Sequence, residues 1–335
     1  CFLMTASLSP LASTPSPAVL VAGSVAYDTV LATPGRFSDT LTPEGLDHIN
    51  LTFPTPVMRR SFGGCAANIA WAMLALGGRP VLWGALGADG GPYLERFKSW
   101  GADLSGLVVL QDCFSSQCFI TTDADGNQIA AFHAGALDRA DEAPMPEAGA
   151  KLAILAPGER RATLRQAERC LEARIPYLFD PGQATPLYGP EGLHTLVSGA
   201  FGVAFSDYEA ELIKRFTGLT PQMLAASGKT VWHTHGARGS SVWLPGADAP
   251  VFVPAAALPE GMTALDPVGA GDAYRGGLLW GLVEGADPVE AARVGAYAAA
   301  VKVTHRGSQD YALSRAEALA LIGRSADGSG HSNSH

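Results

Sequence analysis

The stretch "DPVGAGDAYRGG" at residues 266–277 combines backbone and side-chain groups that could do chemistry together. Gly269, Ala270 and Gly271 leave the main chain open to close approach, and an apolar helical pattern follows them. Amide groups at the start of a helix form an anion site. Asp272 beside that site suits a base that takes a proton from a hydroxyl while the amides hold a phosphoryl group. The alternative is an N-cap aspartate after a flexible turn.

Polar residues near the beginning of the chain could hold a diol. Asp28 follows the first apolar run in "GSVAYD", and its carboxylate could accept two hydrogen bonds from neighbouring hydroxyls. Gly63 and Gly64 permit close backbone approach, and Asn68, in the first turn of a helical pattern, can both donate and accept. Taken singly, each has a structural alternative as a loop-end aspartate, a helix-start glycine or a capping asparagine. Their occurrence together with the distant glycine turn favours a binding site.

Alternating strands and helices must position these residues. Apolar runs without strict alternation predict strands that are buried on both faces, at 19–25, 81–86, 152–157, 177–180, 201–205 and 230–235. Helical spacing predicts helices at 66–76, 162–174, 207–217, 271–284 and 287–304. This order predicts an α/β fold with a mostly parallel sheet flanked by helices. Ligands of such sheets bind at the carboxyl ends of the strands.

Two stretches, at about 33–62 and 107–133, instead show alternating runs and turn signals such as "DADGN". They predict a small β lid inserted into a domain that spans residues 18–324. Closure of a lid excludes water, which a phosphoryl-transferring enzyme requires. The lid could also pair with a second copy of the chain to form a homodimer. Residues 1–17 are expected to be a flexible extension, and the polar segment 325–335 to be disordered.

Composition excludes several partner classes. The 335 residues are 47% hydrophobic and 16% charged, which suits a large buried core. A net charge of -9 argues against nucleic acid and anionic membranes as partners, and no apolar run reaches transmembrane length. Five cysteines without a CxxC pair indicate reduced thiols, so a cytoplasmic location is expected. The chain also lacks the GxGxxG of dinucleotide oxidoreductases after its first strand, and it has no Walker A motif.

Two segments carry a family resemblance. "GGCAANIAWAMLALGG" resembles the first signature of the PfkB/ribokinase family of carbohydrate and nucleoside kinases, and "DPVGAGDAYRGGLLWG" resembles its second. The resemblance covers about residues 18–312 and implies a ribokinase-like fold and an ATP-dependent kinase that uses Mg²⁺. Within that family "GSVAYDTVLATPGRFSDTL", "FDPGQ" and "SDYE" are most similar to bacterial adenosine kinases. The implied reaction is phosphorylation of the 5′-hydroxyl of a nucleoside, adenosine above all.

The resemblance also implies roles for individual residues. Asp272 would be the catalytic base, with an anion hole formed by Gly269, Ala270 and Gly271. The nucleoside would contact Ser24, Asp28, Gly64, Asn68, Phe132 and Gln183. ATP would contact Ser206, Glu209, Thr234, Gly236 and Gly239. Glu209 would act on magnesium indirectly, and Asp266 would lie near a loop for a monovalent cation such as K⁺.

The sequence departs from the family pattern at three positions and leaves two other functions open. Ser206 replaces the Asn of an N-x-x-E motif, Val268 replaces a Thr of the second signature, and Cys118 stands where related adenosine kinases have an aromatic residue. A kinase for ribose or fructose would use the same Asp28 and Asn68 on its diol. A non-catalytic nucleoside-binding protein would need no base at position 272.

Overall fold

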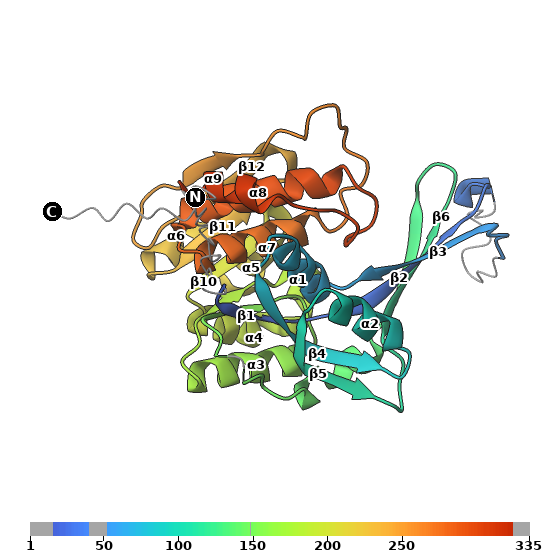
Figure 1. The fold of residues 1–335 in the computed structure, drawn as a ribbon, viewed down its shortest axis with the longest axis horizontal. Helices are drawn as coiled ribbons and strands as arrows, with labels where there is room; N and C mark the ends of the chain where they lie inside the picture. The colour runs from blue at the N-terminus through green and yellow to red at the C-terminus, as the bar shows by residue number, and fades with distance from the viewer. Residues whose placement is uncertain (1–15, 40–51, 148, 324–335) are drawn as a thin grey trace, which may run out of the picture.

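Short apolar runs of the chain form the strands of a central sheet. The computed structural model describes residues 16–39, 52–147 and 149–323. Within these ranges nine strands pair in the order β13-β12-β11-β10-β9-β8-β1-β4-β5 (Figure 1). Their bounds are β1 Ala18–Ala22, β4 Arg79–Gly87, β5 Asp103–Leu110, β8 Leu152–Leu155, β9 Tyr177–Phe179, β10 Gly202–Ser206, β11 Thr230–Thr234, β12 Gly239–Trp243 and β13 Val251–Pro254.

Neighbouring strands of this sheet pair in parallel from β5 through β4, β1, β8, β9 and β10 to β11. Strands β12 and β13 follow β11 in antiparallel pairing. In the centre of the sheet Val21 pairs with both Leu82 of β4 and Ile154 of β8. Because these strands run the same way, the loops that follow β1, β8, β9, β10 and β11 all leave the sheet at the carboxyl ends of the strands. Ligands of open α/β sheets bind at these carboxyl ends.

Helices cover both faces of the large sheet. Successive residues of β1 point to opposite faces, so Val19 and Val21 belong to one apolar cluster and Leu20 to the other. The first cluster is closed by α1 Cys65–Ala75, α2 Gly91–Ser99, α7 Ala270–Val283 and α8 Pro288–Val303. The second is closed by α3 Arg160–Glu172, α4 Thr185–Gly199, α5 Asp207–Thr217 and α6 Pro221–Ala226. Double coverage explains why the strands lack polar alternation. Helix α9 Arg315–Ala320 contributes to a smaller cluster around Trp280.

A second, four-stranded sheet extends from the side of this body (Figure 1). Its order is β3-β2-β6-β7, with bounds β2 Ala26–Ala32, β3 Val57–Gly63, β6 Ser116–Thr122 and β7 Gln128–His133. The expected small β sheet is therefore present, but its bounds differ from those predicted. Residues 26–32 belong to it, and residues 107–110 do not, because they end β5 in parallel pairing with β4. Residues 40–51, part of the expected lid, lie outside the described residues.

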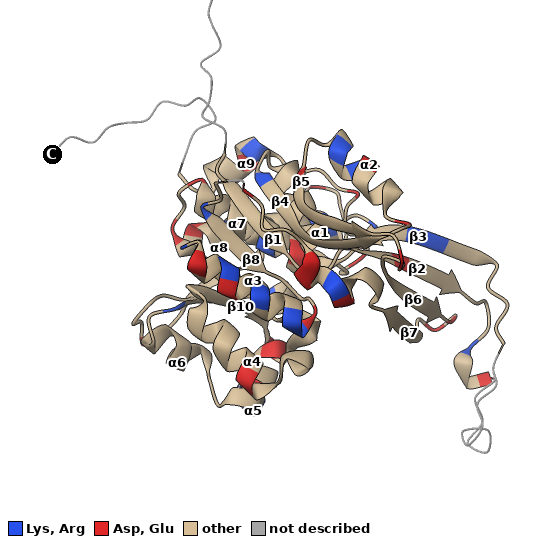
Figure 2. Cartoon of the chain, turned by 90° about the horizontal axis from the view of Figure 1, so that it is seen from below, with Lys and Arg blue, Asp and Glu red and all other residues tan. Residues whose placement is uncertain are grey.

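The expected α/β fold, with a mostly parallel sheet and a separate small sheet, is confirmed. Of the expected end segments, residues 1–15 and 324–335 lie outside the described residues. Figure 2 shows both basic and acidic positions along α3 and a basic band on β3, the strand that contains Arg59 and Arg60. Arg60 is ion-paired with Asp89 at 3.2 Å. In the described ranges no helix combines the length and apolar character that a membrane span requires.

Candidate functional site

A cavity of about 670 Å³ opens at the edge where the parallel strands end. The segments that follow β1, β8 and β9 contribute Ser24, Pro157 and Gly158, and Asp180 with Gln183 to its wall, and β10 contributes its last residue, Ser206. The small sheet supplies Asp28, Cys118 and Phe132, and the starts of α1 and α7 supply further residues, among them Asn68 and Asp272. Residues from both ends of the chain thus face one space. The expected nucleoside contacts all line it, namely Ser24, Asp28, Gly64, Asn68, Phe132 and Gln183.

A second cavity, of about 690 Å³, adjoins the first. Its wall includes the turn after β11 with Gly236 and Gly239, the loop at Asp266, and Ala270 at the start of α7. Ser206, Thr234 and Gly271 line both cavities. Of the residues expected to contact ATP, Glu209 lines only the first cavity, and the others line the second or both. Two ligands bound in these cavities would therefore meet at the start of α7.

The start of α7 has the form of an anion site. Gly269 is the N-cap, with φ 79° and no capping side chain. A Cβ at this position would lie 2.7 Å from Ser308 Oγ, so this left-handed turn against the 308 loop requires glycine. The amide of Ala270 donates to Pro267 O at 3.1 Å. Among the described residues the amides of Gly269 and Gly271 have no acceptor, and these two are open to an anion.

Asp272 lies in the first turn of α7, enclosed by protein atoms except on its cavity side. Burial raises the pKa of its carboxyl to about 7, and the effect is opposed by a hydrogen bond from Asn68 and by the charge of Arg275. Asn68 Nδ2 donates to Asp272 Oδ2 at 2.8 Å. A carboxyl that titrates near neutral pH can take a proton and later release it, as a general base must.

Asn68 is held by groups that the sequence did not single out. Gln309 Nε2 donates to Asn68 Oδ1 at 2.9 Å and to the Tyr93 hydroxyl at 2.6 Å. That hydroxyl donates in turn to Gly63 O at 2.6 Å. Since Asn68 Oδ1 accepts from Gln309, its amide nitrogen is the group that faces Asp272. Gln309 thus sets the orientation of Asn68. The sequence does not predict this contact, because the two residues are 241 positions apart.

Helices α1 and α7 bring Asn68 and Asp272 together because their backbones approach closely. A Cβ on Gly276 would lie 2.7 Å from Ile69 O, so only glycine permits this crossing. Gly64, the N-cap of α1 with φ 89°, packs equally closely on Ala26 N and Ser24 O. The glycines of both predicted signatures therefore serve helix placement as well as ligand access.

Asp28 lies on β2 of the small sheet, not on a loop after the first strand as expected. Burial raises the pKa of its carboxyl to about 6. Among the described residues no donor is hydrogen-bonded to this carboxylate. A Cβ on Gly63 would collide with it, so Gly63 provides its space. A desolvated carboxylate without a partner on the wall of a cavity suits hydroxyl groups of a ligand.

A buried ion pair lines the first cavity. Arg275 Nε donates to Asp180 Oδ2 at 3.1 Å, and both side chains are about 5% exposed or less. Glu209 Oε2 is 4.0 Å from Arg275 and accepts the Ser206 amide at 2.6 Å in a capping box at the start of α5. The guanidinium of Arg275 therefore compensates the charge of Asp180.

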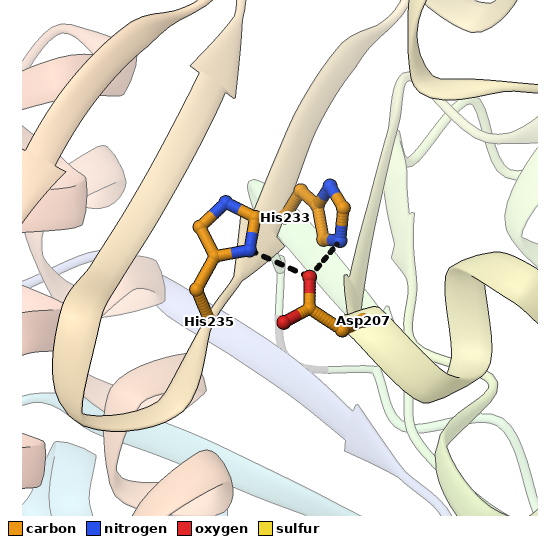
Figure 3. Close-up of side chains that lie close together, drawn as sticks. All are labelled: Asp207, His233 and His235. Atoms are coloured by element: carbon orange, nitrogen blue, oxygen red, sulfur yellow. Dashed lines mark hydrogen bonds and ion pairs between the residues drawn. The ribbon is translucent and has the colours of Figure 1, made fainter.

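Two histidines share an aspartate beside the second cavity (Figure 3). His233 Nε2 and His235 Nδ1 lie 2.9 and 2.7 Å from Asp207 Oδ1. Asp207 Oδ2 accepts from Arg238 at 2.7 Å, and His235 Nε2 is 2.8 Å from Ser241 Oγ. Burial lowers the pKa of His233. Both carboxylate oxygens are paired, so this cluster is a hydrogen-bonded network with one arginine–aspartate ion pair, and it anchors the turn after β11.

Comparisons with known proteins bear on this site. The model of the pfkB family carbohydrate kinases matches residues 20–315. The nucleoside kinase of Methanothermobacter thermautotrophicus is 31% identical over 259 residues, covering 75% of this chain and 81% of that protein. The structure of Burkholderia thailandensis nucleoside kinase in complex with ADP-inosine has a TM-score of 0.76 and 38% identity, covering 91% of this chain and 94% of that one. Methanocaldococcus jannaschii nucleoside kinase, an archaeal member of the ribokinase family, has a TM-score of 0.81 at 24% identity, covering 93% and 99%.

Proposed function

Because the chain belongs to the pfkB family of carbohydrate kinases and has the ribokinase-like fold, we propose that it transfers the γ-phosphoryl group of ATP to the 5′-hydroxyl of a purine nucleoside, adenosine or inosine. The observation that carries the proposal is the hydrogen-bonded pair of Asn68 and Asp272 at the point where two cavities meet. One cavity would hold the nucleoside and the other ATP. The structural neighbour bound to ADP-inosine is 38% identical to this chain and supports a nucleoside as acceptor.

The reaction needs a proton acceptor and a site for the migrating charge. Asp272 takes the proton from the 5′-hydroxyl as the new O–P bond forms, the bond from the γ-phosphorus to the bridging oxygen breaks, and ADP leaves. The open amides of Gly269 and Gly271 stabilise the charge on the transferred oxygens. Asn68 holds the Asp272 carboxylate in place and offers a donor to the sugar.

The small sheet supports nucleoside over free sugar as acceptor. Asp28 would accept hydrogen bonds from two ribose hydroxyls, which both acceptor classes possess. Phe132, on β7 at the rim of the first cavity, is 57% exposed and offers a ring face for a base. A cavity of about 670 Å³ also exceeds what a single pentose fills. Cys118, which has no ring, lines the same wall. Phe132 is therefore the only aromatic side chain of this wall among the described residues.

Magnesium bound with ATP would neutralise charge on the β- and γ-phosphates. Glu209 lines the first cavity and is hydrogen-bonded to Ser206, which lines both cavities, so it is the acidic residue to which we assign a contact with this ion. One of its oxygens already accepts the Ser206 amide, so we assign it to the water shell of the ion and not to direct coordination. The carbonyl and carboxylate oxygens around Asp266 do not fit a further bound cation, since an ammonium group already contacts them.

Assays of ADP release and product formation with adenosine, inosine, ribose and fructose test the proposal. We expect a purine nucleoside to have the highest kcat/KM and the product to carry phosphate on its 5′-oxygen. A higher kcat/KM for ribose or fructose would establish a sugar kinase in its place. Nucleoside binding without any ATP consumption would establish a binding protein.

Asp28→Ala is expected to lower nucleoside affinity by about one to two orders of magnitude, because a hydrogen bond to a charged group contributes about 1.5–3 kcal/mol. Isothermal titration with adenosine and inosine measures this change. Wild-type affinity should also fall as pH drops through about 6, where Asp28 becomes protonated and loses acceptor capacity. Asp125→Ala is the matched control, since Asp125 belongs to the same sheet's hairpin but pairs with Arg36. Equal affinities for Asp28→Ala and wild type would remove Asp28 from the site.

A further inference from the structure

Lys302 has the least exposed cationic side chain among the described residues. It lies in the last turn of α8, and its side chain is 0% exposed. Its Nζ donates to Asp266 O at 2.8 Å and to His305 O at 3.3 Å, and it lies 3.7 Å from Asp266 Oδ2. Two carbonyl oxygens and one carboxylate oxygen therefore surround the ammonium. A buried charge is retained only where such partners compensate its desolvation.

The ammonium joins the two loops that shape the anion site. Asp266 Oδ1 accepts the Val268 amide at 3.0 Å, one residue before Gly269. Asp266 Oδ2 accepts the Gly307 amide at 3.1 Å, in the loop against which Gly269 packs. The same loop continues to Gln309, which orients Asn68. Displacement of either loop would therefore move the open amides relative to Asp272.

Oxygen atoms of this kind are also the ligands of small monovalent and divalent cations. A site made of main-chain carbonyls and a carboxylate could accept either a free ion or a tethered ammonium, and here the chain supplies the ammonium. A second positive charge at the same oxygens would be repelled by Lys302 at close range. Lys302 and a bound cation would therefore compete for the same oxygen atoms, and the expected cation near Asp266 cannot bind while Lys302 occupies them.

We infer that Lys302 is a positioning residue that replaces a bound monovalent cation, so that the loops of the anion site are held without any ion from solution. The inference rests on the proposed kinase function only because it assigns these loops a role in phosphoryl transfer. The activity of the wild-type chain should then not depend on K⁺, and removal of the Lys302 ammonium should create such a dependence.

The first measurement compares wild-type kcat in KCl, NaCl and tetramethylammonium chloride at equal ionic strength, with Mg²⁺ constant. We expect the same kcat in all three salts. Stimulation by K⁺ over tetramethylammonium would overturn the inference, because it would show that an ion acts where the ammonium is placed.

The second measurement uses Lys302→Ala, which removes the charge and leaves room for an ion. In tetramethylammonium chloride its kcat should fall by about tenfold to a hundredfold, since a small displacement of catalytic groups has effects of that order. The nucleoside KM should change less, because Asp28 is not affected. K⁺ should restore part of kcat in a saturable way. Lys302→Met fills the same space with an uncharged chain, so K⁺ should not restore its kcat.

Lys229→Ala is a matched control elsewhere in the fold. Lys229 Nζ also donates to two main-chain carbonyls, Ser198 O at 3.0 Å and Ala200 O at 2.8 Å, but it lines neither cavity. Its removal should leave kcat unchanged in every salt. A similar K⁺ effect in Lys229→Ala would mean that K⁺ acts on the protein in general, and the inference would fail.

Melting temperatures separate this inference from the proposed function, because they require no substrate. K⁺ should raise the melting temperature of Lys302→Ala over its value in tetramethylammonium chloride, and it should not do so for wild type. If Lys302→Ala folds in neither salt, or folds with no selective effect of K⁺ on its melting temperature, the inference is wrong. If K⁺ stabilises the variant selectively while wild type phosphorylates no nucleoside, the inference stands and the proposed function fails.

Discussion

Asp272→Asn is expected to lower kcat by about 10²- to 10⁴-fold, the usual contribution of a general base, while nucleoside affinity changes little. The amide is nearly isosteric with the carboxyl, and its oxygen can still accept the hydrogen bond from Asn68. It cannot take the proton of the 5′-hydroxyl. Steady-state kinetics together with titration calorimetry distinguish the two effects.

The pH profile of the wild-type chain should report the same group. Its pKa is raised to about 7, and a base acts only when deprotonated, so kcat/KM should rise as pH increases through about 7. In Asp272→Asn the residual rate should lack this rise. Asp287→Asn is the matched control: the same change at the N-cap of α8, outside both cavities, should leave kcat and its pH profile as in wild type.

Stability gives an independent check that the variant is folded. An aspartate carboxyl ordinarily has a pKa of 3.8, and in the folded chain burial raises the pKa of Asp272 to about 7, so the folded state binds more protons between these values. The free energy of unfolding therefore loses this contribution as pH rises from about 4 to 7. Asparagine has no charge to desolvate, so at pH 8 the variant should melt at or above the wild-type temperature. Wild-type kcat in a folded Asp272→Asn variant would remove Asp272 as the base.

Arg275→Met is expected to lower the free energy of unfolding by about 3–5 kcal/mol, the usual effect of leaving one partner of a buried ion pair alone. Asp180 is 3% exposed, and burial raises its pKa to about 6 even with Arg275 beside it. Without the guanidinium its charged form would have no compensation. Urea denaturation at pH 8 measures the loss, which should be smaller near pH 5, where Asp180 is protonated.

Two further variants test this explanation. Asp180→Asn combined with Arg275→Met removes the uncompensated charge, so the double variant should be more stable at pH 8 than Arg275→Met alone. Arg139→Met breaks shorter ion pairs, at 2.7 Å to Asp112 and 2.6 Å to Glu142, but on the surface. It should change stability much less, because exposed pairs are screened by solvent. An equal loss in Arg139→Met and Arg275→Met would show that burial of the pair is not the cause.

The parallel sheet could be predicted because burial on both faces leaves a direct mark on the sequence. Runs such as "VLWGAL" and "LAILAP" became β4 and β8, and the helix expected at 207–217 is α5 with the same bounds. Helix α4 was not predicted because Pro186, Gly189 and Pro190 interrupt its pattern, and Gly189 has non-helical φ 66°. The strand 26–32 was missed because it continues directly from the first apolar run, and only pairing with β3 and β6 separates the two sheets.

Site residues that belong to glycine turns or carry acidic side chains could be identified in the sequence. Residues that act through partners distant in the sequence could not. All expected contacts of nucleoside and ATP line one of the two cavities, and their roles stay predictions. Gln309, Tyr93 and Lys302 carry no local signal, because each matters through an atom far away in the sequence. Arg275 was visible as a charge near the glycine turn, but its partner Asp180 is 95 residues earlier.

The link between α1 and α7 has a consequence for how the protein is made. Asn68 is translated 204 residues before its partner Asp272 and 241 before Gln309. A nascent chain on the ribosome therefore carries Asp28 and Asn68 well before Asp272, the open amides and the Gln309 that orients Asn68 emerge from the exit tunnel. Chains that terminate before residue 272 lack the proposed base, so we expect them to consume no ATP.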